Sequence, residues 1–251
     1  MIAALPMYDM PWAQAANDRL WQAVRACLPS DLRARAPDSL TRNRDLWEVW
    51  QAPDLLLAQT CGLPFRARLH DQVTLVASPD HRLPGCPPGH YRSTLIRRQG
   101  ESRDLAALVT SVMAYNEPLS QSGWAAPVTY LASRGLTPGE TRRTGAHVAS
   151  IRAVADGQAD FAAIDAVTWA MVAEGLPDLA ARIDPFDQTA PTPALPYIAA
   201  PGLDADTLSS ALAHGIAALD EADRATLHLH GITRLPAADY TALPLPPAPK
   251  D

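Results

Sequence analysis

Residues 109–135 constrain the fold more than any other stretch, because they predict a strand, a polar loop and a helix in direct succession. Residues 109–114 read as a short buried strand. Residues 124–133 predict a helix, in which Pro127 fits only the first turn, and Gly135 favours an end to that helix. A strand that passes through a short loop into a helix is the basic unit of an α/β fold.

The loop between this strand and this helix concentrates polar side chains. Ser120 and Ser122 supply hydroxyls, Asn116 and Gln121 supply amides, and Gly123 lets backbone come close to a ligand. The amino end of a helix presents free N–H groups and a partial positive charge, so this loop favours an oxyanion. The alternative is that Ser120 or Ser122 only caps the helix, which is a common role for serine.

The rest of the chain alternates strands and helices in a similar way. We expect further strands at residues 2–5, 55–60, 73–77, 91–97, 159–164, 183–186 and 197–200. We expect further helices at residues 12–28, 41–50, 105–108, 148–156, 167–174, 204–219 and 220–229. The proline-dense residues 189–196 indicate an extended crossover and a domain boundary, and the tail, residues 243–251, is predicted to be mobile or draped over the surface.

Polar residues follow several of the predicted strands. In α/β sheets the carboxyl ends of strands gather on one side, where ligands bind. The polar residues at these ends are Tyr8, Gln59, Thr60, Ser93, residues 116–123, His147 and Asp165. The alternatives are a packing or capping role for His147 and an N-cap role for Asp165. We find no evident nucleophile–base pair and no motif of serine hydrolases, zinc proteases, phosphate-binding loops or dinucleotide sites, so the set suits holding an anion.

The size and charge of the chain exclude some classes of protein. Its 251 residues, 47% of them hydrophobic, suffice for one large or two modest domains. The net charge of −6 and the single lysine, Lys250, argue against nucleic-acid binding, and no apolar run is long enough to span a membrane. The three cysteines, Cys27, Cys61 and Cys86, include no CxxC pair, so we expect no metal site. We also expect no cofactor.

Several short segments, taken in order along the chain, carry a family resemblance. They are LPMYD from Leu5, QTCG from Gln59, PGC from Pro84 leading to YRS at residues 91–93, NEPLSQSG from Asn116, GAH from Gly145 and AIDAVTW from Ala163. With this ordered set, the chain resembles the periplasmic-binding-protein-like family of phosphate, phosphite and phosphonate substrate-binding proteins of ABC transporters.

The resemblance implies an α/β, two-lobed periplasmic-binding-protein-like (type 2) fold. Each lobe would be a mixed sheet flanked by helices. The first lobe would comprise residues 1–96 plus 197–251 and the second residues 97–196, with the ligand in a cleft between them. The resemblance implies a monomeric solute-binding protein without catalytic activity, which delivers a small phosphorus oxyanion or organophosphonate to an ABC-transporter permease.

The family pattern also implies a ligand-binding set and a disulfide bond. The Ser-x-Ser-Gly loop would hold the phosphoryl oxygens, and Asp165 would face an amine or a protonated oxygen of the ligand. Cys61 and Cys86, both in motif loops, would form the disulfide, or Cys61 would be a loop thiol in a cytoplasmic protein. The ligand-binding set would comprise Tyr8, Thr60, Ser93, Asn116, Ser120, Gln121, Ser122, Gly123, His147 and Asp165.

Two other functions stay open alongside this one. An enzyme on the same scaffold, similar to enzymes of thiamin-precursor or menaquinone pathways, would use His147 and Asp165 as its acid–base pair. A cytoplasmic ligand sensor is the other alternative. Residues 1–7 read as a strand rather than as a secretory signal, so we expect either a cytoplasmic protein or a sequence that begins after processing, whereas the family resemblance implies the periplasm.

Overall fold

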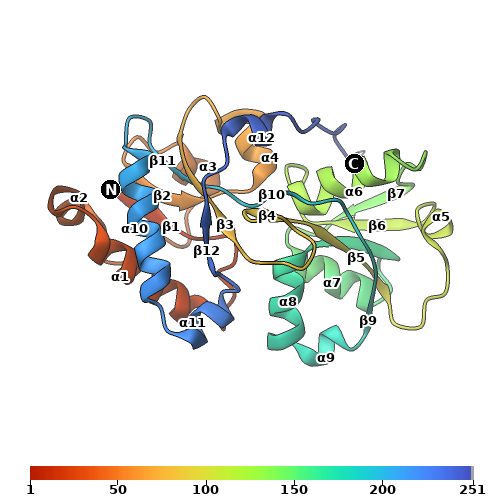
Figure 1. Ribbon diagram of the computed structural model, residues 1–251. Coiled ribbons are helices and arrows are strands. Elements are labelled where there is room, and N and C mark those ends of the chain that lie inside the picture. The colour runs from red at the N-terminus through yellow and green to blue at the C-terminus, as the bar shows by residue number, and fades with distance from the viewer. Residues whose placement is uncertain (250–251) are drawn as a thin grey trace. The chain divides into compact units, whose positions relative to one another are not determined.

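The chain folds into two compact units in the structure, a computed structural model that describes residues 1–249. Unit 1 comprises Met1–His90 and Pro193–Leu243, and unit 2 comprises Tyr91–Thr192 and the tail from Pro244 onward. The chain therefore passes from one unit to the other three times. In Figure 1 unit 1 is drawn in red to orange and in blue, because it takes segments from both ends of the chain. The tail prediction extends to Lys250 and Asp251, which lie outside the described residues.

Unit 1 is built on a five-stranded mixed sheet with the strand order β1-β2-β11-β3-β12. β1 (Ile2–Ala4) runs parallel to β2 (Leu55–Gln59), whose residues are all buried. β11 (Tyr197–Ala199) lies between β2 and β3 (Thr74–Asp80) and is antiparallel to both, and β12 (Gly231–Thr233) is antiparallel to β3. A strand from late in the chain therefore completes the centre of this sheet.

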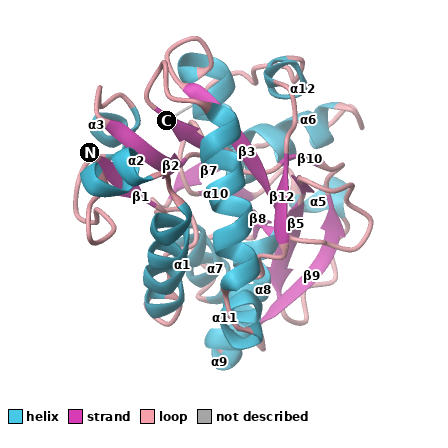
Figure 2. Ribbon diagram, turned by 60° about the vertical axis from the view of Figure 1, so that its left-hand side comes forward, coloured by secondary structure: helices cyan, strands magenta, loops and turns pink. Residues whose placement is uncertain are grey.

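Two long helices of unit 1, α1 (Gln14–Cys27) and α10 (Ala205–Ala218), pack side by side, as Figure 2 shows. They approach closely at Gly215 of α10, where a Cβ atom would lie 2.6 Å from Val24 Cγ2 and 2.8 Å from the Val24 backbone. The shorter helices of this unit are α2 (Ser30–Arg35), α3 (Leu46–Trp50), α4 (Gly62–Pro64), the π-helix η1 (Phe65–Leu69), α11 (Glu221–Thr226) and α12 (Ala237–Thr241).

Unit 2 has its own five-stranded mixed sheet, with the order β7-β6-β8-β5-β9. β6 (Val112–Tyr115) is parallel to β7 (Glu140–Arg143) and to β8 (Phe161–Asp165). β5 (Ser93–Arg98) is antiparallel to β8 and to β9 (Ile183–Gln188). The buried strands β6 and β8 bring their carboxyl ends to the same edge, because they run in the same direction.

The helices of unit 2 follow its strands closely along the chain. They are α5 (Leu105–Leu108), the π-helix η2 (Gln121–Ala125), α6 (Ala126–Ala132), α7 (His147–Ala155), α8 (Ala166–Gly175) and α9 (Pro177–Ala180). A separate two-stranded sheet is formed by β4 (His90–Tyr91) and β10 (Thr192–Pro193). No helix in residues 1–249 is both long and apolar enough to cross a membrane.

The predicted fold class is confirmed, since the structure has two mixed sheets flanked by helices. Some predicted limits are wrong. The helix expected at residues 41–50 begins only at Leu46, because Asn43 adopts a left-handed backbone with φ of 57° and Asp45 caps the helix from outside. The elements without a predicted counterpart include β7, β12, η1 and the short helices α2, α4, α9 and α12.

Candidate functional site

The polar loop of unit 2 runs from the end of β6 into the π-helix η2. Ser120 caps this helix, because its Oγ accepts a hydrogen bond from the Gly123 N–H at 2.9 Å. All residues from Gln121 to Ala125 are buried. The N-cap role considered for Ser120 is therefore confirmed, and the loop packs its polar groups into the interior of unit 2. π-helical turns of this kind often mark functional sites.

Gly123 and Asn116 are in direct contact within this loop. A Cβ atom at position 123 would overlap the Asn116 Oδ1 atom and would lie 3.2 Å from Ser120 Oγ. Asn116 Oδ1 is buried and has no hydrogen-bond partner within residues 1–249. Any larger residue at position 123 would therefore have to displace the Asn116 side chain.

Ser122 and His147 form the central hydrogen bond of the candidate site. Ser122 Oγ lies 2.8 Å from His147 Nε2, at the first residue of α7. His147 Nδ1 is buried and finds no partner in the part of the chain that the structure describes. Because buried N–H groups are seldom left unpaired, the network favours the tautomer with its proton on Nε2. In that tautomer His147 donates to Ser122, and the hydroxyl proton of Ser122 is available to an anion.

His147 is a poor candidate for a catalytic base in this setting. Burial lowers the pKa of His147 from 6.5 to about 4, so the imidazole is neutral near pH 7. Serine hydrolases orient the histidine through a carboxylate on its second nitrogen, whereas Nδ1 here has no partner among the described residues. His147 bonds to Ser122 and Asp165 caps α8, and the acid–base role considered for this pair stays a prediction.

Ser93 and Asp165 occupy neighbouring strands beside this loop. They face each other in the antiparallel register of β5 and β8. Ser93 Oγ donates to the Ser122 carbonyl oxygen at 2.9 Å, so its proton is engaged in holding the loop. Asp165 Oδ1 accepts from the N–H groups of Val167 at 2.8 Å and Thr168 at 3.0 Å. The N-cap alternative for Asp165 is confirmed, and its contact with a ligand stays a prediction.

The predicted site residues fall in both units. Unit 2 brings together Ser93, Asn116, Ser120, Ser122, Gly123 and His147 through the contacts above, and Gln121 Nε2 reaches Thr192 Oγ1 at 3.5 Å. Tyr8 and Thr60 belong to unit 1. Thr60 is fully buried and its Oγ1 has no hydrogen-bond partner in residues 1–249. The ligand roles of all these residues stay predictions.

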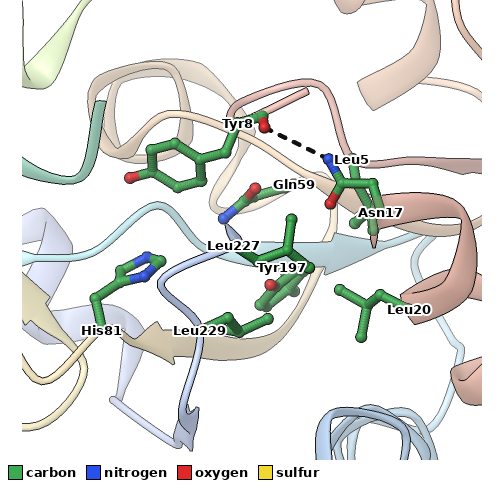
Figure 3. A pocket seen from close by; sticks show the side chains of 9 residues that line it. All are labelled: Leu5, Tyr8, Asn17, Leu20, Gln59, His81, Tyr197, Leu227 and Leu229. Atoms are coloured by element: carbon green, nitrogen blue, oxygen red, sulfur yellow. Dashed lines mark hydrogen bonds between the residues drawn. The ribbon is translucent and has the colours of Figure 1, made fainter. Parts of the chain in front are cut away.

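Tyr8 and a buried histidine border a small cavity in unit 1. The cavity measures about 10 Å³ and is lined by Leu5, Tyr8, Asn17, Leu20, Gln59, His81, Tyr197, Leu227 and Leu229 (Figure 3). The Tyr8 and His81 rings meet edge to face, with centroids 5.3 Å apart. His81 Nδ1 lies 2.6 Å from the His228 carbonyl oxygen, which assigns its proton to Nδ1, and burial lowers its pKa to about 4.

Two buried polar residues of unit 1 have no place in the predicted site. His81 is 5% exposed, and Arg66 of η1 is 6% exposed. Neither follows a predicted strand directly, so the position-based argument does not reach them. The structure holds no disulfide among the described residues, so the Cys61–Cys86 pair stays a prediction. It also holds no cluster of three or more metal-binding side chains within that part of the chain.

Comparison with known proteins identifies one matching family. The sequence model described as "ABC transporter, phosphonate, periplasmic substrate-binding protein" matches residues 55–243. No curated protein shows a significant sequence match to the chain. Several solved structures are similar to it, at sequence identities where the likeness concerns the fold alone.

One similar structure is PhnD1 from Prochlorococcus marinus in complex with methylphosphonate, with a TM-score of 0.68, 16% identity, and coverage of 96% of this chain and 94% of that one. A binding protein component of an ABC phosphonate transporter from Pseudomonas aeruginosa has a TM-score of 0.68 and 16% identity. The match covers 95% of this chain and 82% of that one. A protein from Xanthomonas citri bound to chloride ion has a TM-score of 0.67 and 14% identity. The match covers 97% of this chain and 98% of that one.

Proposed function

Because this chain belongs to the family of periplasmic substrate-binding proteins of phosphonate ABC transporters, we propose that it captures a small phosphorus oxyanion or organophosphonate through the loop of residues 116–123. The family implies a solute-binding role and a permease as partner. The ligand class and the loop are our own assignment. Hydrogen bonds within and around the loop support it as the binding element. Ser122 bonds to Ser93 and to His147, and Gly123 bonds to Ser120.

The arrangement around Ser122 is the observation that carries this proposal. Its carbonyl oxygen is held by Ser93, and its Oγ accepts from His147 in the favoured tautomer. In that tautomer the Ser122 hydroxyl hydrogen is not used in the bond to His147, so it can be donated to an anion. A buried donor of this kind bonds an anion strongly, because the charge-assisted bond forms away from water.

The neutrality of His147 also fits an anion site that discriminates by hydrogen bonding. Its pKa of about 4 means that the imidazole adds no positive charge near pH 7. Hydroxyl and N–H donors would then supply the attraction for the phosphoryl oxygens. Asp165, the predicted acceptor, would favour a phosphonate that still carries a proton over sulfate, which carries none at neutral pH. This choice between anions is testable directly.

A thermal-shift screen tests the ligand class. We expect stabilisation by at least one of phosphate, phosphite, methylphosphonate and aminoethylphosphonate, and none by sulfate. A ligand at 100 times its dissociation constant adds about 2.7 kcal/mol to the unfolding free energy, which gives a clear shift. The proposal is contradicted if none of the four phosphorus anions raises the melting temperature, or if sulfate raises it equally.

Substitution of Ser122 tests the loop. Ser122→Ala should weaken binding of the responding anion by about tenfold to a hundredfold, as expected for one hydrogen bond to a charged group. The matched control is Ser133→Ala, which removes an exposed hydroxyl just after α6 that bonds only locally to the Tyr130 carbonyl. Calorimetric titration of both variants compares them with the parent. If Ser122→Ala binds the anion with unchanged affinity, the loop is not the binding element.

A further inference from the structure

The described tail, residues 244–249, packs on unit 2 rather than on the helix that precedes it. After α12 the chain leaves unit 1 at Leu243, and the residues that follow belong to unit 2. Four of these six residues are prolines: Pro244, Pro246, Pro247 and Pro249. They form neither helix nor strand. A defined contact nevertheless anchors them, because Trp124 Nε1 donates a hydrogen bond to the Pro247 carbonyl oxygen at 2.8 Å.

The residue that holds the tail is itself rigidly placed. Trp124 lies in η2, is 4% exposed, and packs with Tyr115 and Val128 in a small apolar cluster. The Trp124 and Tyr115 rings have centroids 5.1 Å apart and are tilted by 53°. A buried indole needs a partner for its N–H, and the tail supplies that partner. The indole therefore points its one donor at the tail.

Proline-rich segments are recognised by this type of contact. They adopt an extended helix that has no internal hydrogen bonds, so their carbonyl oxygens remain open to outside donors. Aromatic surfaces bind such segments at a low entropy cost, because proline restricts the free chain beforehand. The tail has two overlapping PxxP spacings, at residues 244–247 and 246–249.

We propose that Trp124, supported by Tyr115 and Val128, is a recognition site for a proline-rich segment, and that the chain's own tail occupies it. The site lies directly after the loop of residues 116–123 in the sequence, and both rings flank that loop. Trp124 is therefore committed to the tail and not to a small ligand. This inference does not depend on which anion the loop binds.

The first test removes only the donor. In Trp124→Phe the ring remains but the N–H is lost, and we expect the amides of Leu245 and Ala248 to become mobile in NMR relaxation, with order parameters falling from about 0.85 towards 0.6 or below. The matched control is Trp21→Phe, since Trp21 Nε1 also donates to a proline carbonyl, that of Pro37 at 3.0 Å, but in unit 1. The control should leave the tail ordered. A tail equally ordered in Trp124→Phe overturns the proposal.

The second test supplies the segment from outside. A chain that ends at Leu243 should lose protection of the Trp124 indole N–H against hydrogen exchange, and a peptide of residues 244–251 should restore it saturably. Trp124→Phe in the shortened chain should weaken peptide binding by about threefold to tenfold, as one neutral hydrogen bond predicts. A peptide with alanine at all four prolines should bind more weakly still. Equal binding of the two peptides overturns the proposal, and so does an indole N–H that stays protected without the tail. If the shortened chain fails to fold, the first test decides.

Discussion

At the scale of single residues, the candidate site depends on how closely polar atoms approach a glycine. Gly123 donates its N–H to Ser120 Oγ, and its Cα faces Asn116 Oδ1 with no room for a further carbon atom. The sequence suggests a glycine that admits a ligand. The structure shows that this glycine also admits a neighbouring side chain, a requirement that only the folded loop reveals.

Gly123→Ala should therefore disrupt the loop. We expect it to cost about 1–3 kcal/mol of unfolding free energy, the usual cost of overpacking, and to weaken anion binding. Gly231→Ala is the control, because no atom lies within 4 Å of a Cβ built there. Denaturant unfolding measures both variants. Asn116→Ala should reduce the penalty of Gly123→Ala, and a penalty that stays the same in the double variant contradicts the proposed clash.

His81 gives unit 1 a dependence on pH. Its folded pKa is about 4 against 6.5 for an ordinary histidine, chiefly because it is buried, while Asp80, His228 and His230 add smaller effects of both signs. Between these two values the unfolded chain binds a proton that the folded chain does not. The unfolding free energy should thus fall as the pH drops from about 6.5 to about 4, by up to about 3 kcal/mol.

Unfolding of His81→Asn across this pH range checks the prediction. The asparagine amide can still donate to the His228 carbonyl oxygen, but it does not titrate. The variant should show a flatter pH dependence than the parent between pH 6.5 and 4. His214→Asn, which removes an exposed histidine from α10, should keep the parent's slope. A parental slope in His81→Asn rules out this histidine as the cause.

Sequence reasoning reaches some site residues and misses others for a physical reason. Ser122 and Asp165 are predicted because they follow or end a strand, whereas Ser93 opens β5 and reaches the same edge because β5 is antiparallel to β8. His81 is missed because its partner, the His228 carbonyl, is 147 residues away in the sequence. The pairing of His147 with Ser122 is likewise a tertiary contact, and local spacing gives no sign of it.

At the scale of elements, apolar periodicity predicts the long helices and buried strands well. The helix expected at residues 12–28 is α1 (Gln14–Cys27), and the one expected at 204–219 is α10 (Ala205–Ala218). β7 (Glu140–Arg143) is missed because it is a polar, largely exposed strand at the edge of its sheet, where one side needs no apolar partner. It pairs in parallel with β6 through the backbone ladder.

The packing of α1 against α10 yields a prediction at this scale. Gly→Ala inside a helix normally stabilises it by about 1 kcal/mol, because alanine has the higher helix propensity. Gly215→Ala should do the opposite, since its Cβ would press on the Val24 backbone, which cannot rotate away. Thermal unfolding should show a lower Tm for Gly215→Ala and little change for the control Ser210→Ala, at an exposed position of the same helix. A raised Tm for Gly215→Ala means that the helices are not in close contact.

At the scale of the whole molecule, the two units differ in how the chain builds them. Unit 2 takes all five strands of its sheet from the continuous segment Tyr91–Thr192, and its apolar clusters lie in that segment too. Unit 1 needs two segments, Met1–His90 and Pro193–Leu243. The chain enters unit 1 again within the proline-dense residues 189–196, while the tail's return to unit 2 has no local signal beyond its prolines.

The segment 91–192 should fold by itself. We expect the isolated fragment to show a cooperative thermal transition and a mixed α/β circular dichroism spectrum, since it contains a complete sheet and core. A fragment of equal length that cuts across both units, residues 46–147, is the control and should remain unfolded. A fragment 91–192 without a cooperative transition shows that unit 2 depends on the rest of the chain.

The position of β11 between β2 and β3 has a consequence for synthesis on the ribosome. Translation delivers β2 and β3 early, but the strand that joins them emerges only after the whole segment 91–192 has been made. Until then, the facing edges of β2 and β3 have no partner, which is the state most prone to wrong pairing and to capture by chaperones. Unit 1 can therefore complete its sheet only after the whole segment 91–192 has been made.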